Sequence, residues 1–140
     1  MMSRTRLLLA DDHLETAAQL CDLLEQEFDV IGHVTDGRTL VCEAARLLPD
    51  VIVSDISMPE MDGITAASLI LEVNPMARIV LISVHADPLL VARGLAIGVL
   101  GYVLKLAAGD DLVPAVHAAL RGERHVSSCM HEEELRRSRR

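Results

Sequence analysis

Five short apolar runs, separated by segments of helical periodicity, constrain the fold of this chain more than any other feature of its sequence. The runs occupy residues 6–10, 30–34, 51–54, 79–83 and 102–104. They lack the strict alternation of apolar and polar residues that marks a strand with one face in solvent. Strands that are apolar on both faces belong to a parallel sheet with helices packed against each side.

The segments between these runs predict five helices, which we place at residues 14–24, 39–48, 63–73, 89–96 and 110–120. Pro49 ends the second helix, Pro88 suits the first turn of the fourth, and Gly98 ends the fourth. Asp62, which precedes Gly63, predicts a turn or a helix cap. Strands and helices that alternate with right-handed crossovers make a doubly wound α/β domain, whose ligand site lies at the carboxyl ends of the strands.

The composition is that of one folded domain. The chain has 140 residues, of which 51% are hydrophobic, and a formal net charge of −8. This hydrophobic fraction excludes a disordered chain. The longest stretch without a charged residue, 94–104, is too short to cross a bilayer, and Asp11 and Asp12 end the first apolar run too early for a signal peptide. We therefore expect a soluble, cytoplasmic domain with no membrane partner.

The distribution of charge, cysteine and histidine excludes further classes of protein. Residues 1–120 hold 7 basic and 17 acidic residues, and an acidic body of this kind repels nucleic acid. Cys21, Cys42 and Cys129 are scattered and odd in number, so they do not build a disulfide framework. His13, His33, His85 and His117 have no serine or cysteine partner in a pattern that suggests a catalytic triad.

Charged and hydroxyl side chains stand at the ends of four predicted strands. They are Asp11 and Asp12 after the first strand, Asp55 after the third, Ser83 at the end of the fourth and Lys105 after the fifth. Three carboxylates in one cleft repel one another, and a hard divalent cation such as Mg²⁺ removes that repulsion. Lys105 is the only lysine in the chain, and a compact ammonium suits a phosphate oxygen. The sequence therefore predicts a Mg²⁺ site beside a phosphate-binding lysine.

Four segments at these strand ends point to a family. They are LLLADDH at 7–13, VIVSDISMPEMDG at 51–63, VLIS at 80–83 and GYVLK at 101–105. Together they resemble the receiver (CheY-like) domain of two-component response regulators, and with GERHVSS at 122–128 they are most similar to its LuxR/NarL-type subfamily. The resemblance implies a flavodoxin-like sheet of five parallel strands in the order 2-1-3-4-5. It also implies a receiver domain over residues 1–121 and a C-terminal linker or helical tail over 122–140.

The resemblance gives each strand-end residue a role. Asp55 is the phosphoacceptor, which takes a phosphoryl group from a phosphohistidine on a sensor histidine kinase. Lys105 and the Ser83 hydroxyl each pair with a phosphoryl oxygen. The groups that hold Mg²⁺ are Asp12, Asp55 and the backbone carbonyl of Ser57, with Asp11 holding a metal-bound water. Such a domain is a phosphoacceptor that assists its own phosphorylation and dephosphorylation, and we do not expect an enzyme.

The same resemblance implies a two-state switch. After phosphorylation the Ser83 hydroxyl moves toward the phosphoryl group, and Tyr102 rotates inward behind it. The surface of the fourth helix, fifth strand and fifth helix then reports the change. On this surface we expect a homodimer or partner contact, formed by the apolar residues Leu89, Leu90, Leu100 and Leu106.

Other functions fit parts of the pattern. A haloacid-dehalogenase-like phosphatase needs a second aspartate two residues after the first, where this chain has Ser57. A flavodoxin-like cofactor binder needs a phosphate loop after the first strand, where Asp11 and Asp12 would repel a phosphate. A stand-alone or phosphorylation-independent receiver, acting by protein contact, stays open as an alternative. We favour the receiver portion of a transcription regulator, whose DNA-binding output domain is absent from this chain.

Overall fold

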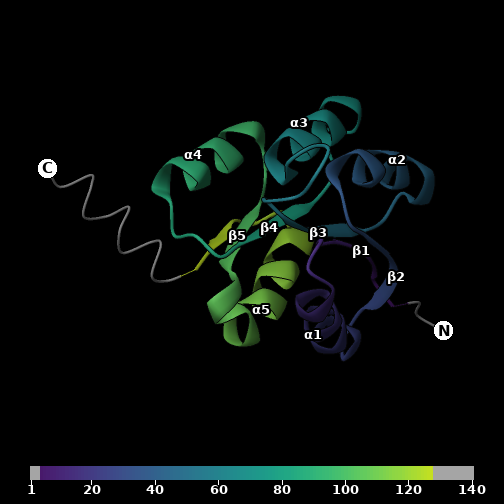
Figure 1. Ribbon diagram of the computed structural model, residues 1–140, viewed down its shortest axis with the longest axis vertical. Coiled ribbons are helices and arrows are strands. Elements are labelled where there is room, and N and C mark those ends of the chain that lie inside the picture. The colour runs from purple at the N-terminus through teal and green to yellow at the C-terminus, as the bar shows by residue number, and fades with distance from the viewer. Residues whose placement is uncertain (1–3, 128–140) are drawn as a thin grey trace, which may run out of the picture.

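A six-stranded parallel sheet runs through the computed structural model, which describes residues 4–127 (Figure 1). The strands are β1 (Arg6–Ala10), β2 (Asp29–Val34), β3 (Val51–Asp55), β4 (Ile79–Ser83), β5 (Gly101–Leu104) and β6 (His125–Val126). Their order across the sheet is β2-β1-β3-β4-β5-β6, and every neighbouring pair is parallel. The expected five-stranded sheet of order 2-1-3-4-5 is confirmed, and a sixth strand extends it beside β5.

Helices cover both faces of the sheet, with α1 and α5 on one face and α2, α3 and α4 on the other (Figure 1). The helices are α1 (Leu14–Glu25), α2 (Gly37–Leu47), α3 (Gly63–Val73), α4 (Pro88–Ile97) and α5 (Ala108–Leu120), and a 3₁₀ turn, η1 (Lys105–Ala107), joins β5 to α5. Successive strand residues point to opposite faces, so each central strand contributes to two cores. Leu7 and Leu9 of β1 pack with α1 and α5, whereas Leu8 and Ala10 pack with the other three helices.

The burial of the strands explains why their sequences read as continuous apolar runs. Every residue of β3, β4 and β5 is buried, as are the last four residues of β1. A parallel sheet with helices on both faces buries its central strands on both sides. The prediction of strands that are buried on both sides is confirmed for β1, β3, β4 and β5, whereas the edge strand β2 is buried only at Val34.

Aspartate caps fix the starts of three helices at the carboxyl edge of the sheet. Asp36 accepts the Thr39 N–H at 2.7 Å at the start of α2, and Asp87 accepts the Leu89 N–H at 2.9 Å at the start of α4. Asp62 accepts the N–H groups of the first turn of α3, at 2.8 and 2.9 Å. A capping carboxylate satisfies amide groups that the helix itself leaves free. The prediction of a cap at Asp62 is confirmed.

Strand β6 belongs to a stretch that we expected to be a linker or a helical tail beyond residue 121. Instead, the His125 N–H donates to the Leu100 carbonyl at 2.9 Å, and the Ser127 N–H donates to the Tyr102 carbonyl at 3.0 Å. Ser127 is fully buried, and its Oγ accepts the Leu104 N–H at 3.0 Å. Residues 125–127 are thus part of the sheet edge, and residues 128–140 lie outside the described residues. Within residues 4–127, no helix has the length and apolar character to cross a bilayer.

Candidate functional site

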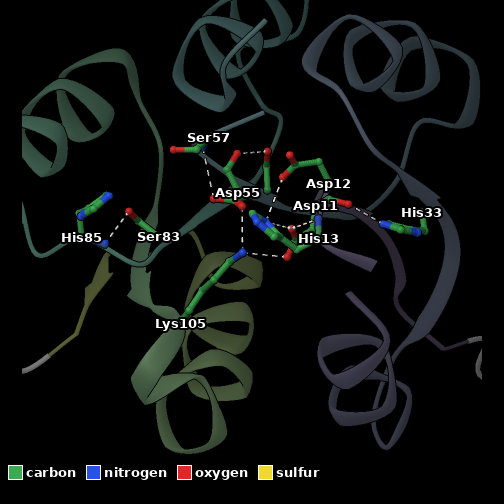
Figure 2. A network of polar contacts seen from close by, with 10 residues as sticks. Asp11, Asp12, His13, His33, Asp55, Ser57, Ser83, His85 and Lys105 are labelled. Carbon is green, nitrogen blue, oxygen red and sulfur yellow. Dashed lines mark hydrogen bonds and ion pairs between the residues drawn. The ribbon is translucent and has the colours of Figure 1, made fainter. Parts of the chain in front are cut away.

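Three strand-end residues from β1, β3 and β5 meet at the carboxyl edge of the sheet (Figure 2). The ammonium Nζ of Lys105 lies 2.9 Å from Oδ2 of Asp55 and 3.0 Å from Oδ2 of Asp11. The Lys105 side chain is only 10% exposed, and the two carboxylates are almost completely buried. Charges removed from water interact more strongly than charges at the surface. The structure therefore brings Asp11, Asp55 and Lys105 into one buried ionic cluster.

Asp11 is held from several sides. Its Oδ1 accepts the His13 N–H at 2.9 Å, and its backbone carbonyl accepts a hydrogen bond from His33 Nε2 at 2.8 Å. Its own N–H donates to the Val34 carbonyl at 3.0 Å, which joins it to the end of β2. A buried carboxylate needs such partners because an unpaired buried charge is costly. These contacts hold both the backbone and the side chain of Asp11 in one position beside Lys105.

Asp12 presents an oxygen with unused hydrogen-bonding capacity. Its Oδ1 is buried, and among residues 4–127 this atom accepts no hydrogen bond; it lies 3.3 Å from His13 Nδ1. One ligand atom each from Asp11, Asp12, His13 and Asp55 lies within 4.8 Å of all the others. Carboxylate oxygens are the ligands that Mg²⁺ prefers. This donor set, with a buried oxygen that lacks a partner, fits a divalent cation.

The environment of Asp55 and Lys105 changes the acidity of both groups. Burial raises the pKa of the Asp55 carboxyl above its ordinary value, and the Lys105 ammonium offsets this effect only in part. Burial also disfavours the charged form of Lys105, yet hydrogen bonds to Asp55 and Asp11 raise its pKa above the ordinary value. Lys105 therefore stays charged at neutral pH, and Asp55 is a more basic carboxylate than one in water.

A glycine holds the loop after β3 against Asp55. A Cβ atom added to Gly63 would lie 2.0 Å from the backbone oxygen of Asp55, a distance that real Cβ atoms do not show. The Gly63 N–H donates to the Ile56 carbonyl at 2.7 Å, and the Ser57 N–H donates to Asp55 Oδ1 at 3.3 Å. The close approach of α3 to β3 therefore fixes the backbone of Asp55 and Ile56, and the Ser57 N–H in the same loop bonds the carboxylate. From the sequence, Gly63 is predicted only to follow a turn or helix cap at Asp62, and its contact with Asp55 is not predicted.

Ser83 lies at the end of β4, and Tyr102 lies on the neighbouring strand β5. Ser83 is buried, and its Oγ accepts the His85 N–H at 3.0 Å, so the hydroxyl is bonded within its own loop (Figure 2). Tyr102 is fully buried, with its hydroxyl 3.5 Å from the His85 carbonyl, and burial raises the pKa of this hydroxyl. We expected Tyr102 to rotate inward after phosphorylation. In this structure it already points inward.

The four leucines expected to form a partner surface divide into two pairs. Leu89 and Leu106 are exposed, at 65% and 96%. Leu90 packs against the core under α2, α3 and α4, and Leu100 packs against the core under α1 and α5. Leu90 and Leu100 are therefore partly buried, and the fully exposed apolar surface at this face comes from Leu89 and Leu106.

Comparison with known proteins agrees with this geometry. The family model of the response regulator receiver domain matches residues 7–117. The transcriptional regulatory protein YdfI of Bacillus subtilis is 34% identical over 119 residues, which cover 84% of this chain and 55% of YdfI. The chain thus spans about half the length of the curated relatives that it matches.

Two solved structures are similar over almost the whole chain. A LuxR-family two-component response regulator from Aurantimonas sp. SI85-9A1 has a TM-score of 0.94 at 26% identity, with 99% of this chain and 100% of that chain covered. The isolated receiver domain of RcsB from Salmonella enterica serovar Typhimurium, studied with the phosphomimetic BeF₃⁻, has a TM-score of 0.85 at 27% identity; 93% of this chain and 98% of that one are covered. The resemblance seen in the sequence, including its LuxR-type character, is confirmed. The chain belongs to the family of response regulator receiver domains.

Proposed function

We propose that Asp55 accepts a phosphoryl group from a phosphohistidine of a sensor histidine kinase, in a transfer that depends on Mg²⁺. The observation that supports this most directly is the buried contact of Lys105 with Asp55 at 2.9 Å, next to the acidic cluster. A carboxylate is a competent nucleophile toward phosphorus only where the incoming negative charge is neutralised. Lys105 and a divalent cation would supply that neutralisation from two sides.

The residues of the cluster suit Mg²⁺ as a ligand set. Asp12 and Asp55 would bind it directly, together with the backbone carbonyl of Ser57, and Asp11 would hold one of its waters. The buried Oδ1 of Asp12 supports this role because it lacks a hydrogen-bond partner within residues 4–127. When bound, Mg²⁺ would offset the negative charge of the carboxylates and of the phosphoryl oxygens.

The chain's own groups carry the transfer. A carboxylate oxygen of Asp55 forms a bond to phosphorus while the bond from phosphorus to the donor imidazole nitrogen breaks, and its electron pair returns to that imidazole. Lys105, which its two carboxylate contacts keep protonated, pairs with one phosphoryl oxygen. The Ser83 hydroxyl leaves the His85 N–H and donates a hydrogen bond to a second phosphoryl oxygen. In this scheme the chain is the phosphoacceptor, and the phosphoryl group ends on its own Asp55.

Asp55→Asn should abolish phosphorylation, because an amide lacks the nucleophilic oxygen. The measurement is intact mass after incubation with Mg²⁺ and a small phosphodonor such as acetyl phosphate. The wild-type chain gains one phosphoryl group, and the variant and an EDTA-treated sample gain none. Asp110→Asn, which changes an exposed aspartate in the first turn of α5, is the matched control and keeps the gain. Modification that persists in Asp55→Asn would refute this acceptor, and an unmodified wild type would favour a receiver that acts by contact alone.

Phosphorylation then changes the surface of α4, β5 and α5. Ser83 and Tyr102 act as the switch, and because Tyr102 is already buried, movement of Ser83 and its loop accounts for most of the change. The signal passes to an output domain that controls transcription, as the name of YdfI and the partial coverage of that protein suggest. A cytoplasmic location is part of this proposal. The receiver itself does not bind DNA, because its body is acidic.

Leu89 and Leu106 are the exposed residues through which a homodimer would form on this surface. Sedimentation velocity with and without the phosphoryl mimic beryllofluoride measures the oligomeric state of the chain directly. We expect a shift toward dimer with the phosphoryl mimic, and a loss of that shift in Leu106→Ser. A solved RcsB complex contains dimers, which is a precedent from a relative at 27% identity. An unchanged monomer at high concentration in both conditions would contradict the homodimer and leave a different protein as partner.

A further inference from the structure

His13 brings a nitrogen atom to the edge of the acidic cluster. Its Nδ1 lies 3.3 Å from Asp12 Oδ1 and 3.8 Å from Asp11 Oδ1 (Figure 2). His13 occupies the N-cap position of α1, yet its side chain makes no capping hydrogen bond there. The His13 N–H is bonded to Asp11 Oδ1 at 2.9 Å, which fixes the backbone from which the ring projects. The imidazole is thus turned toward the carboxylates.

The donor atoms gathered at this point are of two kinds. Asp11, Asp12 and Asp55 offer oxygens, and His13 offers a nitrogen that lies within 4.8 Å of each of them. A hard ion such as Mg²⁺ gains little from an imidazole and takes oxygen ligands instead. First-row transition ions bind imidazole well, and their affinity for a mixed nitrogen and oxygen site rises from Mn²⁺ toward Cu²⁺. The identity of residue 13 therefore bears on which cation the site selects.

We propose that His13 Nδ1 is a direct ligand for a divalent transition ion, such as Co²⁺, that binds between Asp12 and Asp55. This inference rests on the proposed function, because it places the ion in the same site as Mg²⁺. The neutral imidazole gives its Nδ1 lone pair to the ion and keeps its proton on Nε2. The ring is 68% exposed, so Nε2–H stays hydrated while Nδ1 faces the cluster.

The other two histidines at this edge do not offer the same donor. His33 uses Nε2 to hold the Asp11 backbone carbonyl at 2.8 Å, outside the group of carboxylate oxygens. His85 takes part through its backbone, and its exposed ring lies beyond Ser83 from the cluster (Figure 2). His85→Ala is therefore a matched control, because it removes one histidine at the same edge of the sheet and leaves the cluster unchanged.

Calorimetric titration of the whole chain with Co²⁺ and with Mg²⁺ tests the proposal. His13→Ala should weaken Co²⁺ binding by about tenfold or more, since even the loss of a group that only supports a ligand has an effect of this size. The same variant should leave the Mg²⁺ affinity nearly unchanged. His85→Ala should match the wild type for both ions. His13 caps no amide with its side chain, so the Ala variant should fold.

A spectroscopic measurement separates ligation from a structural effect. Proton NMR of the Co²⁺-loaded chain should show a strongly shifted, exchangeable imidazole N–H resonance from Nε2 of a bound histidine. The resonance should be absent in His13→Ala and present in His85→Ala. Equal Co²⁺ affinities in wild type and His13→Ala, or a resonance that survives His13→Ala, would overturn the proposal. Mg²⁺-dependent phosphorylation of Asp55 would still stand in that case, so the two failures are distinguishable.

Discussion

Gly63→Ala is expected to lower the free energy of unfolding by about 3 kcal/mol, because the new methyl group would overlap the backbone of β3. The ideal Cβ position is 2.0 Å from the Asp55 oxygen and 3.0 Å from the Ile56 Cα, and neither backbone atom can rotate away. The helix α3 must then move outward, and the hydrogen bond from the Gly63 N–H to the Ile56 carbonyl breaks. Urea unfolding followed by circular dichroism measures the loss.

Gly109→Ala is the matched control for this substitution. Gly109 lies in α5, and its added Cβ would meet no atom within 4 Å. Alanine is a better helix former than glycine, so this variant should gain up to about 1 kcal/mol. Opposite signs for the same chemical change would locate the effect of Gly63 in its contact with β3. If both variants unfold at the wild-type urea concentration, the packing of α3 on Asp55 described above is wrong.

The elements that could be predicted are those whose signal is local. The strand at 79–83 and the helix at 63–73 begin and end at the predicted residues, because a buried apolar run and a capping aspartate act within a few residues. The site could be predicted in outline for a related reason. Parallel strands end at one edge, so the acidic residues directly after β1 and at the end of β3 lie near the lysine directly after β5.

The features that were missed depend on contacts between distant residues. Strand β6 has two residues, and its place in the sheet comes from backbone hydrogen bonds such as that from the His125 N–H to the Leu100 carbonyl. No periodicity can appear in two residues. The inward position of Tyr102 is likewise set by packing, since it lies in the same core as Val126 of β6. The contact of Gly63 with Asp55 joins two elements that the sequence separates by a loop.

The orientation of side chains at the site was also beyond the sequence. Asp11 and Asp12 are neighbours in the chain, yet Asp11 is fully buried against Lys105, whereas the Asp12 side chain is 31% exposed near His13. Successive side chains in an extended segment point in opposite directions, which explains why the two aspartates differ in burial. It does not explain which of them faces Lys105. That choice follows from the Asp11 carbonyl and N–H, which bond to His33 and Val34 of β2.

Lys105→Met should destabilise the chain by about 3 kcal/mol at neutral pH in the absence of divalent ions. The substitution keeps the length of the side chain and removes the cation that two buried carboxylates share. Removing one partner of a buried ion pair leaves a charge without compensation, which costs about 3–5 kcal/mol. Proton uptake by Asp55, whose pKa burial already raises, limits the loss to the lower end of that range. Thermal or urea unfolding in EDTA measures the change. A variant as stable as wild type would contradict a charged cluster at this edge.

Asp12→Asn should change stability in the opposite direction under the same conditions. The cluster without a cation holds three carboxylates and one ammonium, so removing one negative charge relieves repulsion and should stabilise the chain by about 0.5–1 kcal/mol. Saturating Mg²⁺ should reverse this difference, so that wild type becomes more stable than Asp12→Asn. Binding to the folded state at a concentration of about 100 times the dissociation constant adds about 2.7 kcal/mol to wild type, and less to a variant that binds Mg²⁺ more weakly. In a urea titration, Asp12→Asn would then be the more stable protein in EDTA, and wild type would be the more stable protein in Mg²⁺. A purely structural role for Asp12 would not produce this reversal.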